Sequence, residues 1–127
     1  MENKTAANLK AARDLLAQPG GWTTGWYAKT ASGAEVSAAY EKASCFCAIG
    51  AVWRTYGNTA CPDGSGVNST EVQVLLRAIK DVTGEDWTFV HDWNDAQTSV
   101  ESVLAVFDRA IELAQAEEAQ SASVLGA

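Results

Sequence analysis

The chain has 127 residues, a formal net charge of −7 and an apolar fraction of 47%. This length and composition are typical of one globular domain with its own core. No run of 18 apolar residues is present, which excludes a membrane-spanning helix, and the first residues lack the layout of a signal peptide. We therefore expect a cytoplasmic protein.

The charge is distributed unevenly along the chain. Residues 1–60 hold six Lys/Arg and four Asp/Glu, whereas residues 61–127 hold three Lys/Arg and twelve Asp/Glu. Proteins that bind duplex nucleic acid neutralise phosphates with Lys and Arg, so this acidic chain is a poor candidate for that role. The acidic half indicates either solubility alone or a face that docks on a basic partner protein.

The cysteines do not form a recognisable metal motif. The chain has three Cys and one His but no Cys-x2-Cys pair, so we expect no metal and no other cofactor. Cys45 and Cys47 are too close in sequence for an easy mutual disulfide, and Cys61 would be the odd one in any pairing scheme. Free thiols in a reducing compartment are the expectation.

The first half of the chain predicts one helix and a small extended element. Apolar residues follow helical spacing over residues 4–17, and Pro19-Gly20-Gly21 ends that helix. Aromatic and threonine residues with turn residues after them predict a short β-hairpin across residues 25–37.

The segment from Ser44 to Tyr56 is predicted to be the buried central helix. Ser44 is a good N-cap, and the residues from Cys45 to Trp53 carry no polar side chain. A helix that is apolar on all sides belongs in a core, and small residues such as Cys47 and Gly50 would allow close packing.

The second half predicts two amphipathic helices. After a loop over residues 58–66, Asn68 caps a helix that ends near Gly84, residues 85–97 are irregular, and Thr98 begins a capping box for the last helix. The fold class is therefore α+β and mostly α, with about four helices around a buried central helix and a small β-hairpin. We expect a single globular domain over residues 1–116 and a flexible C-terminal tail over 117–127.

Two groups of residues are candidates for function. Cys45 at a helix start, with His91 and the neighbouring carboxylates, predicts at most a weak cysteine–histidine catalytic pair. The alternative is that Cys45 and Cys47 are small core residues. The second group, in which aromatic rings lie near polar groups, predicts a ligand wall or an interface anchor, against the alternative that the rings cap the core. Its members are Trp22, Trp26, Tyr27, Arg54, Trp93, Asn94 and Asp95.

Several short motifs together resemble a family. They are Gly21-Trp22, Gly25-Trp26-Tyr27-Ala28, Cys45-Phe46-Cys47-Ala48-Ile49-Gly50-Ala51, Trp93-Asn94-Asp95 and Phe107-Asp108-Arg109-Ala110-Ile111. Over residues 9–114 the chain resembles an uncharacterised family of small bacterial and phage proteins. The sequence departs from the family pattern after Asp95, where Ala96-Gln97-Thr98-Ser99 stands in place of a Pro-Gly-Arg-Thr-like turn. The resemblance implies a phage or mobile-element accessory protein, and hence the host cytoplasm.

Three functional hypotheses follow. The first is a small non-enzymatic binding protein, with a counter-defence role, that sequesters a small ligand such as a nucleotide-derived messenger or docks on a host protein. An anionic ligand would require Arg54 and the basic N-terminal half to line its site. The second is a cysteine-dependent hydrolase or transferase that uses Cys45 and His91. The third is a homo-oligomeric structural or virion-associated component.

Overall fold

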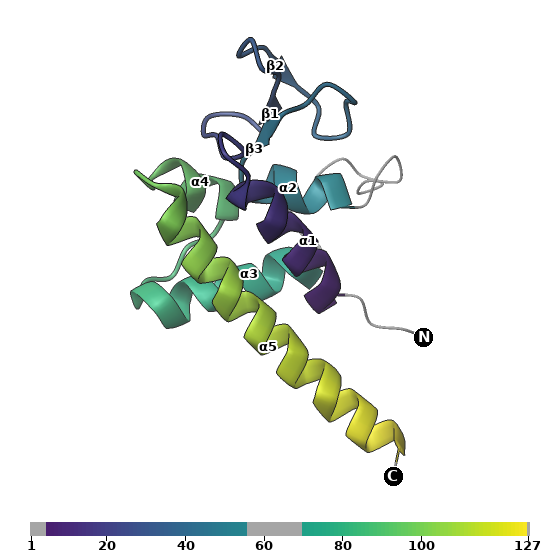
Figure 1. Ribbon diagram of the computed structural model, residues 1–127. Coiled ribbons are helices and arrows are strands. Elements are labelled where there is room, and N and C mark those ends of the chain that lie inside the picture. Colours follow the sequence, from purple (N-terminus) through teal and green to yellow (C-terminus); the bar gives the residue numbers. More distant parts are fainter. Residues whose placement is uncertain (1–4, 56–69, 127) are drawn as a thin grey trace.

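The computed structural model describes residues 5–55 and 70–126. Within these ranges the chain forms five helices and a three-stranded sheet (Figure 1). The elements are, in chain order, α1 (Thr5–Ala17), β1 (Ala28–Lys29), β2 (Glu35–Val36), β3 (Cys45–Phe46), α2 (Ala48–Thr55), α3 (Thr70–Thr83), α4 (Val90–Asp95) and α5 (Val100–Gly126). The α+β, mostly α class expected from the sequence is confirmed. No helix in the described ranges is long and apolar enough to cross a membrane.

The helical body forms because three amphipathic helices bury their apolar faces against one another. Helix α1 packs on α5 and α2, and α3 packs on α5 from another side (Figure 1). The predicted apolar spacing of α1 is confirmed, since Leu9, Ala12 and Leu16 are buried. The stripe of α5 is confirmed as well, with Phe107 and Ala110 fully buried.

The sheet lies at the end of the molecule opposite the C-terminal part of α5 (Figure 1). Strand β1 is central and pairs antiparallel with β2 and β3. Ala28 faces Val36 on one side and Phe46 on the other. The predicted hairpin corresponds to β1 and β2, and β3 is an additional strand that the sequence did not predict.

The predicted start of the central helix at Ser44 is wrong. Residues 45–46 form β3, and α2 begins only at Ala48. An apolar run of this kind suits a buried strand as well as a buried helix. Pairing decides the outcome, because Ser44 N donates to Lys29 O at 2.9 Å and Cys47 N donates to Tyr27 O at 3.1 Å. Helix α2 is nevertheless buried along Ala48–Val52, as expected for a central helix.

The C-terminal half follows the predicted order of helices with one addition. Helix α3 ends at Thr83, and Gly84 follows in the left-handed conformation, φ 78°, with its N–H donating to Lys80 O. The region predicted to be irregular contains the short helix α4. The loop over 58–66, Cys61, the Asn68 cap and the end of the predicted helix at Tyr56 lie outside the described residues.

Helix α5 continues beyond residue 116, where the sequence predicts the end of the globular domain. The helix runs to Gly126, and its C-terminal part extends past the other helices (Figure 1). Two contacts connect its middle to the body. Ala6 N donates to Glu118 Oε2 at 2.9 Å, and Arg77 pairs with Glu117. Residues 117–126 are thus helical, while the domain end at 116 and the flexibility of the tail stay predictions.

Candidate functional site

The buried side chain of Asn94 connects three segments of the chain. Its Oδ1 accepts hydrogen bonds from Trp22 Nε1 at 2.8 Å and from Ala48 N at 3.0 Å. Its Nδ2 donates to Thr23 O at 3.2 Å. Asn94 has no exposed surface, so each of these bonds replaces one that water would have made. The amide therefore fixes helix α4 against both the start of α2 and the loop after α1.

Asp95 extends this network to the surface. Its Oδ1 accepts hydrogen bonds from Gly25 N at 2.9 Å and from Asn94 Nδ2 at 3.3 Å. Gly25 has φ 83°, a left-handed conformation that glycine adopts without strain. The loop before β1 is thereby held beside α4, and a pocket lies between the two.

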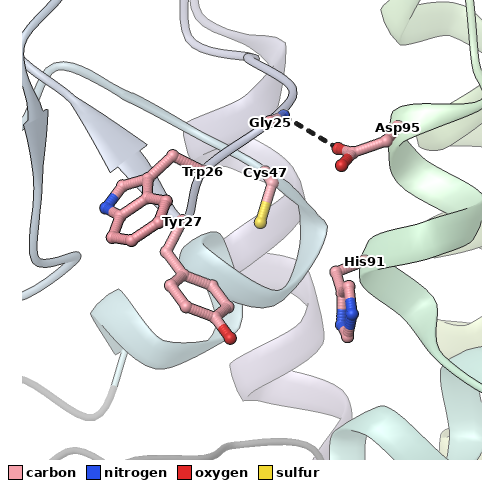
Figure 2. Close-up of a pocket in the computed structure, with 6 residues that line it drawn as sticks. All are labelled: Gly25, Trp26, Tyr27, Cys47, His91 and Asp95. Atoms are coloured by element: carbon pink, nitrogen blue, oxygen red, sulfur yellow. Dashed lines mark hydrogen bonds between the residues drawn. The ribbon is translucent and has the colours of Figure 1, made fainter.

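The pocket has a volume of about 200 Å³. Figure 2 shows Trp26 and Tyr27 on one side, His91 and Asp95 of α4 on the other, and the Cys47 thiol between them. The described residues that line it are Gly25, Trp26, Tyr27, Cys47, His91 and Asp95. The pocket thus lies between the segment that precedes β1, the residue that precedes α2, and helix α4.

The aromatic wall of the pocket is only partly buried. The Trp26 and Tyr27 rings are 6.0 Å apart with an interplanar angle of 57°, and Tyr27 meets Trp53 edge-on at 5.7 Å. Trp26 remains 46% exposed although it is the largest kind of apolar side chain. An exposed tryptophan at the mouth of a pocket is available to contact a ligand or a partner.

Cys47 caps helix α2. Its carbonyl oxygen accepts from Ala51 N at 2.8 Å, and its Sγ accepts from Gly50 N at 3.3 Å. This is the hydrogen-bond pattern of an N-cap residue, with sulfur in the place that a hydroxyl oxygen usually takes. Burial raises the pKa of the Cys47 thiol to about 11, an effect stronger than that of the backbone N–H groups that would stabilise a thiolate. The thiol is therefore protonated at neutral pH.

His91 is half-buried at the α4 side of the pocket. Its ring stacks on Phe89, with centroids 5.3 Å apart and an interplanar angle of 25°. Its Nε2 is 3.4 Å from Asp92 Oδ1, and its Nδ1 is shielded from solvent with no hydrogen-bond partner in the described part of the chain.

The predicted pair of Cys45 and His91 is not the pair that the fold brings to the pocket. Cys45 lies on β3, its Sγ 3.7 Å from Lys29 O, and it is not among the residues that line the pocket. Cys47, two residues later in the chain, lines the pocket instead. Cys45 also lacks the helix-start environment that the sequence suggested, since the helix begins three residues later.

Arg54 lies away from the pocket. Its Nη1 donates to Ala38 O at 3.1 Å and to Tyr40 O at 2.7 Å, and its guanidinium carbon lies 5.8 Å from the centre of the Phe46 ring. The guanidinium holds the turn between β2 and β3 in place. The expectation that Arg54 would line an anion site does not match this position.

The other predicted site residues divide into two groups. Trp26, Tyr27 and Asp95 line the pocket, whereas Trp22 and Asn94 support it through their mutual hydrogen bond. Trp93 is 2% exposed and belongs to the core. Sequence reasoning missed Gly25 and Cys47. For Gly25 the position beside two aromatic residues was a usable signal, but nothing local distinguished Cys47 from Cys45.

A second depression, of about 470 Å³, lies between α3, α5 and the loop before α4. Its lining includes Leu76, Trp87 and Leu113 together with charged groups. Several of those charges already have partners: Lys80 pairs with Asp86, and Arg77 with Glu117. The smaller pocket is the better candidate site because the shielded Nδ1 of its His91 has no hydrogen-bond partner among the described residues. Within residues 5–55 and 70–126, no group of three His, Cys, Asp or Glu residues is placed to hold a metal ion.

Comparison with known proteins gives a match to a protein family. No curated protein and no solved structure is significantly similar to this chain. Residues 1–113 match the family described as "Family of unknown function (DUF6197)". This match spans every described element up to α4 and about half of α5. The chain therefore belongs to the DUF6197 family.

Proposed function

We propose that the protein is a small non-enzymatic binding protein that holds a small ligand, or one side chain of a partner protein, in the pocket between Gly25 and Asp95. The observation that carries this proposal is the construction of the pocket. Two aromatic rings, an imidazole and a carboxylate meet around one cavity, and the buried hydrogen bonds of Asn94 hold its two sides at a set distance. Walls fixed in advance lose little conformational entropy on binding.

The size of the pocket limits what enters it. An apolar cavity of about 150 Å³ holds one benzene molecule, and sites for drug-sized ligands span roughly 300–1,000 Å³. A pocket of about 200 Å³ therefore takes a single ring or a compact head group. A larger ligand, or a partner protein, would insert one such group and leave the remainder outside.

The state of Cys47 supports binding over catalysis. A cysteine nucleophile reacts as the thiolate, and catalytic cysteines have a lowered pKa. The pKa of Cys47 is raised to about 11, and its sulfur is engaged as the cap of α2. Both features suit a structural thiol in the wall of a binding site.

The setting that we propose is a phage or mobile-element accessory protein that acts against a host defence. Its support is the resemblance of the motifs around Cys45-Phe46-Cys47 and Trp93-Asn94-Asp95 to a family of small bacterial and phage proteins. Expressing the protein in a defended host and counting plaques of a sensitive phage tests this setting separately from ligand binding. Restored plaque formation supports it, and unchanged protection counts against it.

The binding proposal is tested by screening a library of single-ring and small polar fragments by ¹H–¹⁵N NMR. Fragments that bind are expected to shift the Gly25 amide and the Trp26 indole signals. In Trp26→Ala the binding should be lost, whereas Tyr40→Ala should retain it. Tyr40 is a fair control because it is exposed to a similar degree, 42% against 46%, and does not line the pocket. If no fragment perturbs these signals, the pocket is not a binding site.

A further inference from the structure

The charges around the pocket are of one sign. Among its described lining residues, Asp95 carries a carboxylate and none is a lysine or arginine. The nearby cations are engaged elsewhere, since Lys29 Nζ donates to Thr24 O at 3.0 Å and Arg54 donates to the turn at Ala38 and Tyr40. An anionic group in this cavity would meet the Asp95 carboxylate, with no lysine or arginine among the described lining residues to compensate it.

One oxygen of the Asp95 carboxylate accepts no hydrogen bond from the described residues. Its Oδ1 receives the N–H groups of Gly25 and Asn94, while its Oδ2 receives no hydrogen bond from the residues that the structure describes. The bonds to Oδ1 hold the carboxylate in one orientation at the edge of the cavity. A ligand that donates to Oδ2 would therefore find an acceptor that is already positioned.

The facing wall suits a positive charge for an independent reason. The faces of tryptophan and tyrosine rings carry negative charge density, and cations bind over them within about 6 Å of the ring centre. Trp26 and Tyr27 are adjacent rings, 6.0 Å apart and inclined to each other by 57°, and both line the same small cavity. With the carboxylate on the opposite side, as Figure 2 shows, the cavity has the composition of an aromatic cage for a cation.

We propose that this pocket binds an organic cation, such as a quaternary ammonium or guanidinium head group, between the Trp26 and Tyr27 rings and the Asp95 carboxylate. This inference rests on the proposed function and names its ligand class. A head group of this kind fits within about 200 Å³. The head group comes either from a free small molecule or from a methylated lysine or an arginine of a partner protein, and the chemistry of recognition is the same.

The test compares cations with neutral molecules of the same shape. Choline is paired with 3,3-dimethylbutan-1-ol, and butylguanidinium with butylurea, each titrated into the intact protein and followed by NMR at the Gly25 and Trp26 signals. We expect each cation to bind about tenfold or more tightly than its neutral counterpart, the effect of a charge-assisted contact on a desolvated site. Equal affinity within each pair would overturn the choice of a cation but would leave the binding pocket itself in place. Absence of binding by all four molecules would overturn the cation site, and the fragment screen then decides separately whether the pocket binds any ligand.

Two substitutions distinguish the effect of the Asp95 carboxylate on choline binding from the effect of the overall negative charge of the surface. Asp95→Asn removes the charge, and its amide oxygen can still accept from Gly25 N, so the loop keeps its anchor. Glu101→Gln removes the same charge at an exposed residue that does not line the pocket. Asp95→Asn should weaken choline binding about fivefold or more, and Glu101→Gln by less than about twofold, since exposed charges are screened by salt. If the two variants bind choline equally, the Asp95 assignment is wrong.

The source of the head group is decided by a second pair of ligands. N-acetyl-trimethyllysine amide and N-acetyl-arginine amide carry the head groups in a peptide setting, whereas choline and butylguanidinium carry them as free molecules. Tighter binding of the blocked amino acids assigns the site to a partner protein, and tighter binding of the free molecules assigns it to a metabolite. Either result supports the cation site. In both cases Trp26→Phe should retain part of the affinity that Trp26→Ala loses. The phenyl face still binds cations, but less strongly than the indole face.

Discussion

Trp22 Nε1 donates a 2.8 Å hydrogen bond to the side-chain oxygen of Asn94, a residue 72 positions later in the chain. The same oxygen accepts from Ala48 N at the start of α2. One buried amide thus joins the loop after α1, the central helix and α4. The pocket between Gly25 and Asp95 depends on this junction, because its two sides come from the segments that Asn94 connects.

Replacing Asn94 should destabilise the whole fold. Asn94→Ala leaves the buried Ala48 N–H without an acceptor and removes the partner of Trp22, and each loss of this kind costs about 1–3 kcal/mol. We expect the free energy of unfolding in urea to fall by about 2–4 kcal/mol. Gln97→Ala is the control, since this amide makes a single hydrogen bond, to Trp93 O, and lies nearer the surface. An equal loss in the two variants would contradict the central role of Asn94.

Gly50 is required by the close approach of α2 to the chain at Tyr27. A Cβ at this position would lie 1.8 Å from the Tyr27 carbonyl oxygen, a backbone atom that cannot rotate away. Gly50→Ala gains about 1 kcal/mol of helix propensity, yet the overlap should reverse this and destabilise the protein by about 3 kcal/mol. Thermal unfolding measures the net effect.

The matched control for Gly50 is Gly33→Ala. A Cβ on Gly33 meets no atom within 4 Å, but Gly33 has φ 92°, so this variant reports backbone strain without overlap. We expect it to cost about 1 kcal/mol. A larger loss for Gly33→Ala than for Gly50→Ala would show that α2 and Tyr27 are not closely packed.

Arg54 should contribute to stability and not to ligand binding. Arg54→Ala removes donors to two carbonyl oxygens and the contact with the Phe46 ring, which together should cost about 1–3 kcal/mol in the free energy of unfolding. The affinity for choline should stay unchanged. Lys42→Ala, which removes an exposed positive charge from the same region, should alter neither quantity. Loss of choline affinity in Arg54→Ala alone would contradict the assignment of Arg54 to the turn and not to the pocket.

Glu71 lowers stability at neutral pH. Burial raises the pKa of its carboxyl above the ordinary value of 4.5, so the folded state holds the proton more tightly than the unfolded state does. Below pH 4.5 the carboxyl is protonated in both states, and burying it costs no charge desolvation. As the pH rises through the higher pKa of the folded state, the buried group must ionise and the free energy of unfolding falls. Glu71→Gln should therefore be more stable than the parent protein at pH 7, and the advantage should shrink toward pH 4.

Glu101→Gln provides the comparison for Glu71. Both residues lie in the first turn of a helix, where a negative charge is favourable, but Glu101 is exposed. Glu101→Gln should be slightly destabilising at pH 7, with no gain at any pH. Denaturant unfolding of the three proteins at pH 4, 5.5 and 7 gives the comparison, and an unchanged or lower stability of Glu71→Gln at pH 7 would contradict the prediction.

Cys47 should resist alkylation in the folded protein. Since its pKa is raised to about 11, less than one thiol in a thousand is ionised at pH 7.5, and the sulfur is buried. Iodoacetamide labelling followed by peptide mass spectrometry should modify the partly exposed Cys45 first. In urea the two residues should react at similar rates. Rapid labelling of Cys47 that depends on His91 would favour the cysteine-enzyme hypothesis instead.

The sequence identified the helices that depend on local pattern. The apolar stripes of α1, α3 and α5 are visible at helical spacing, and glycine marks the end of α3. These features are readable because one buried face and one terminator are enough to define an amphipathic helix. Of the pocket, the sequence indicated Trp26, Tyr27 and Asp95, because aromatic rings near polar groups are typical of a ligand wall.

The tertiary structure decided the features that depend on distant partners. The run from Cys45 to Trp53 has no polar residue to show its periodicity, so hydrogen bonds to Lys29 and Tyr27 determine where the strand ends and α2 begins. The same pairing puts Cys47 rather than Cys45 in the pocket. Arg54 lies away from the pocket because its guanidinium donates to the carbonyl groups of Ala38 and Tyr40. The position of that turn cannot be predicted from local sequence pattern. Side-chain periodicity is a local property of a chain, whereas the partner of a buried amide, thiol or guanidinium is settled only when segments far apart in sequence come together.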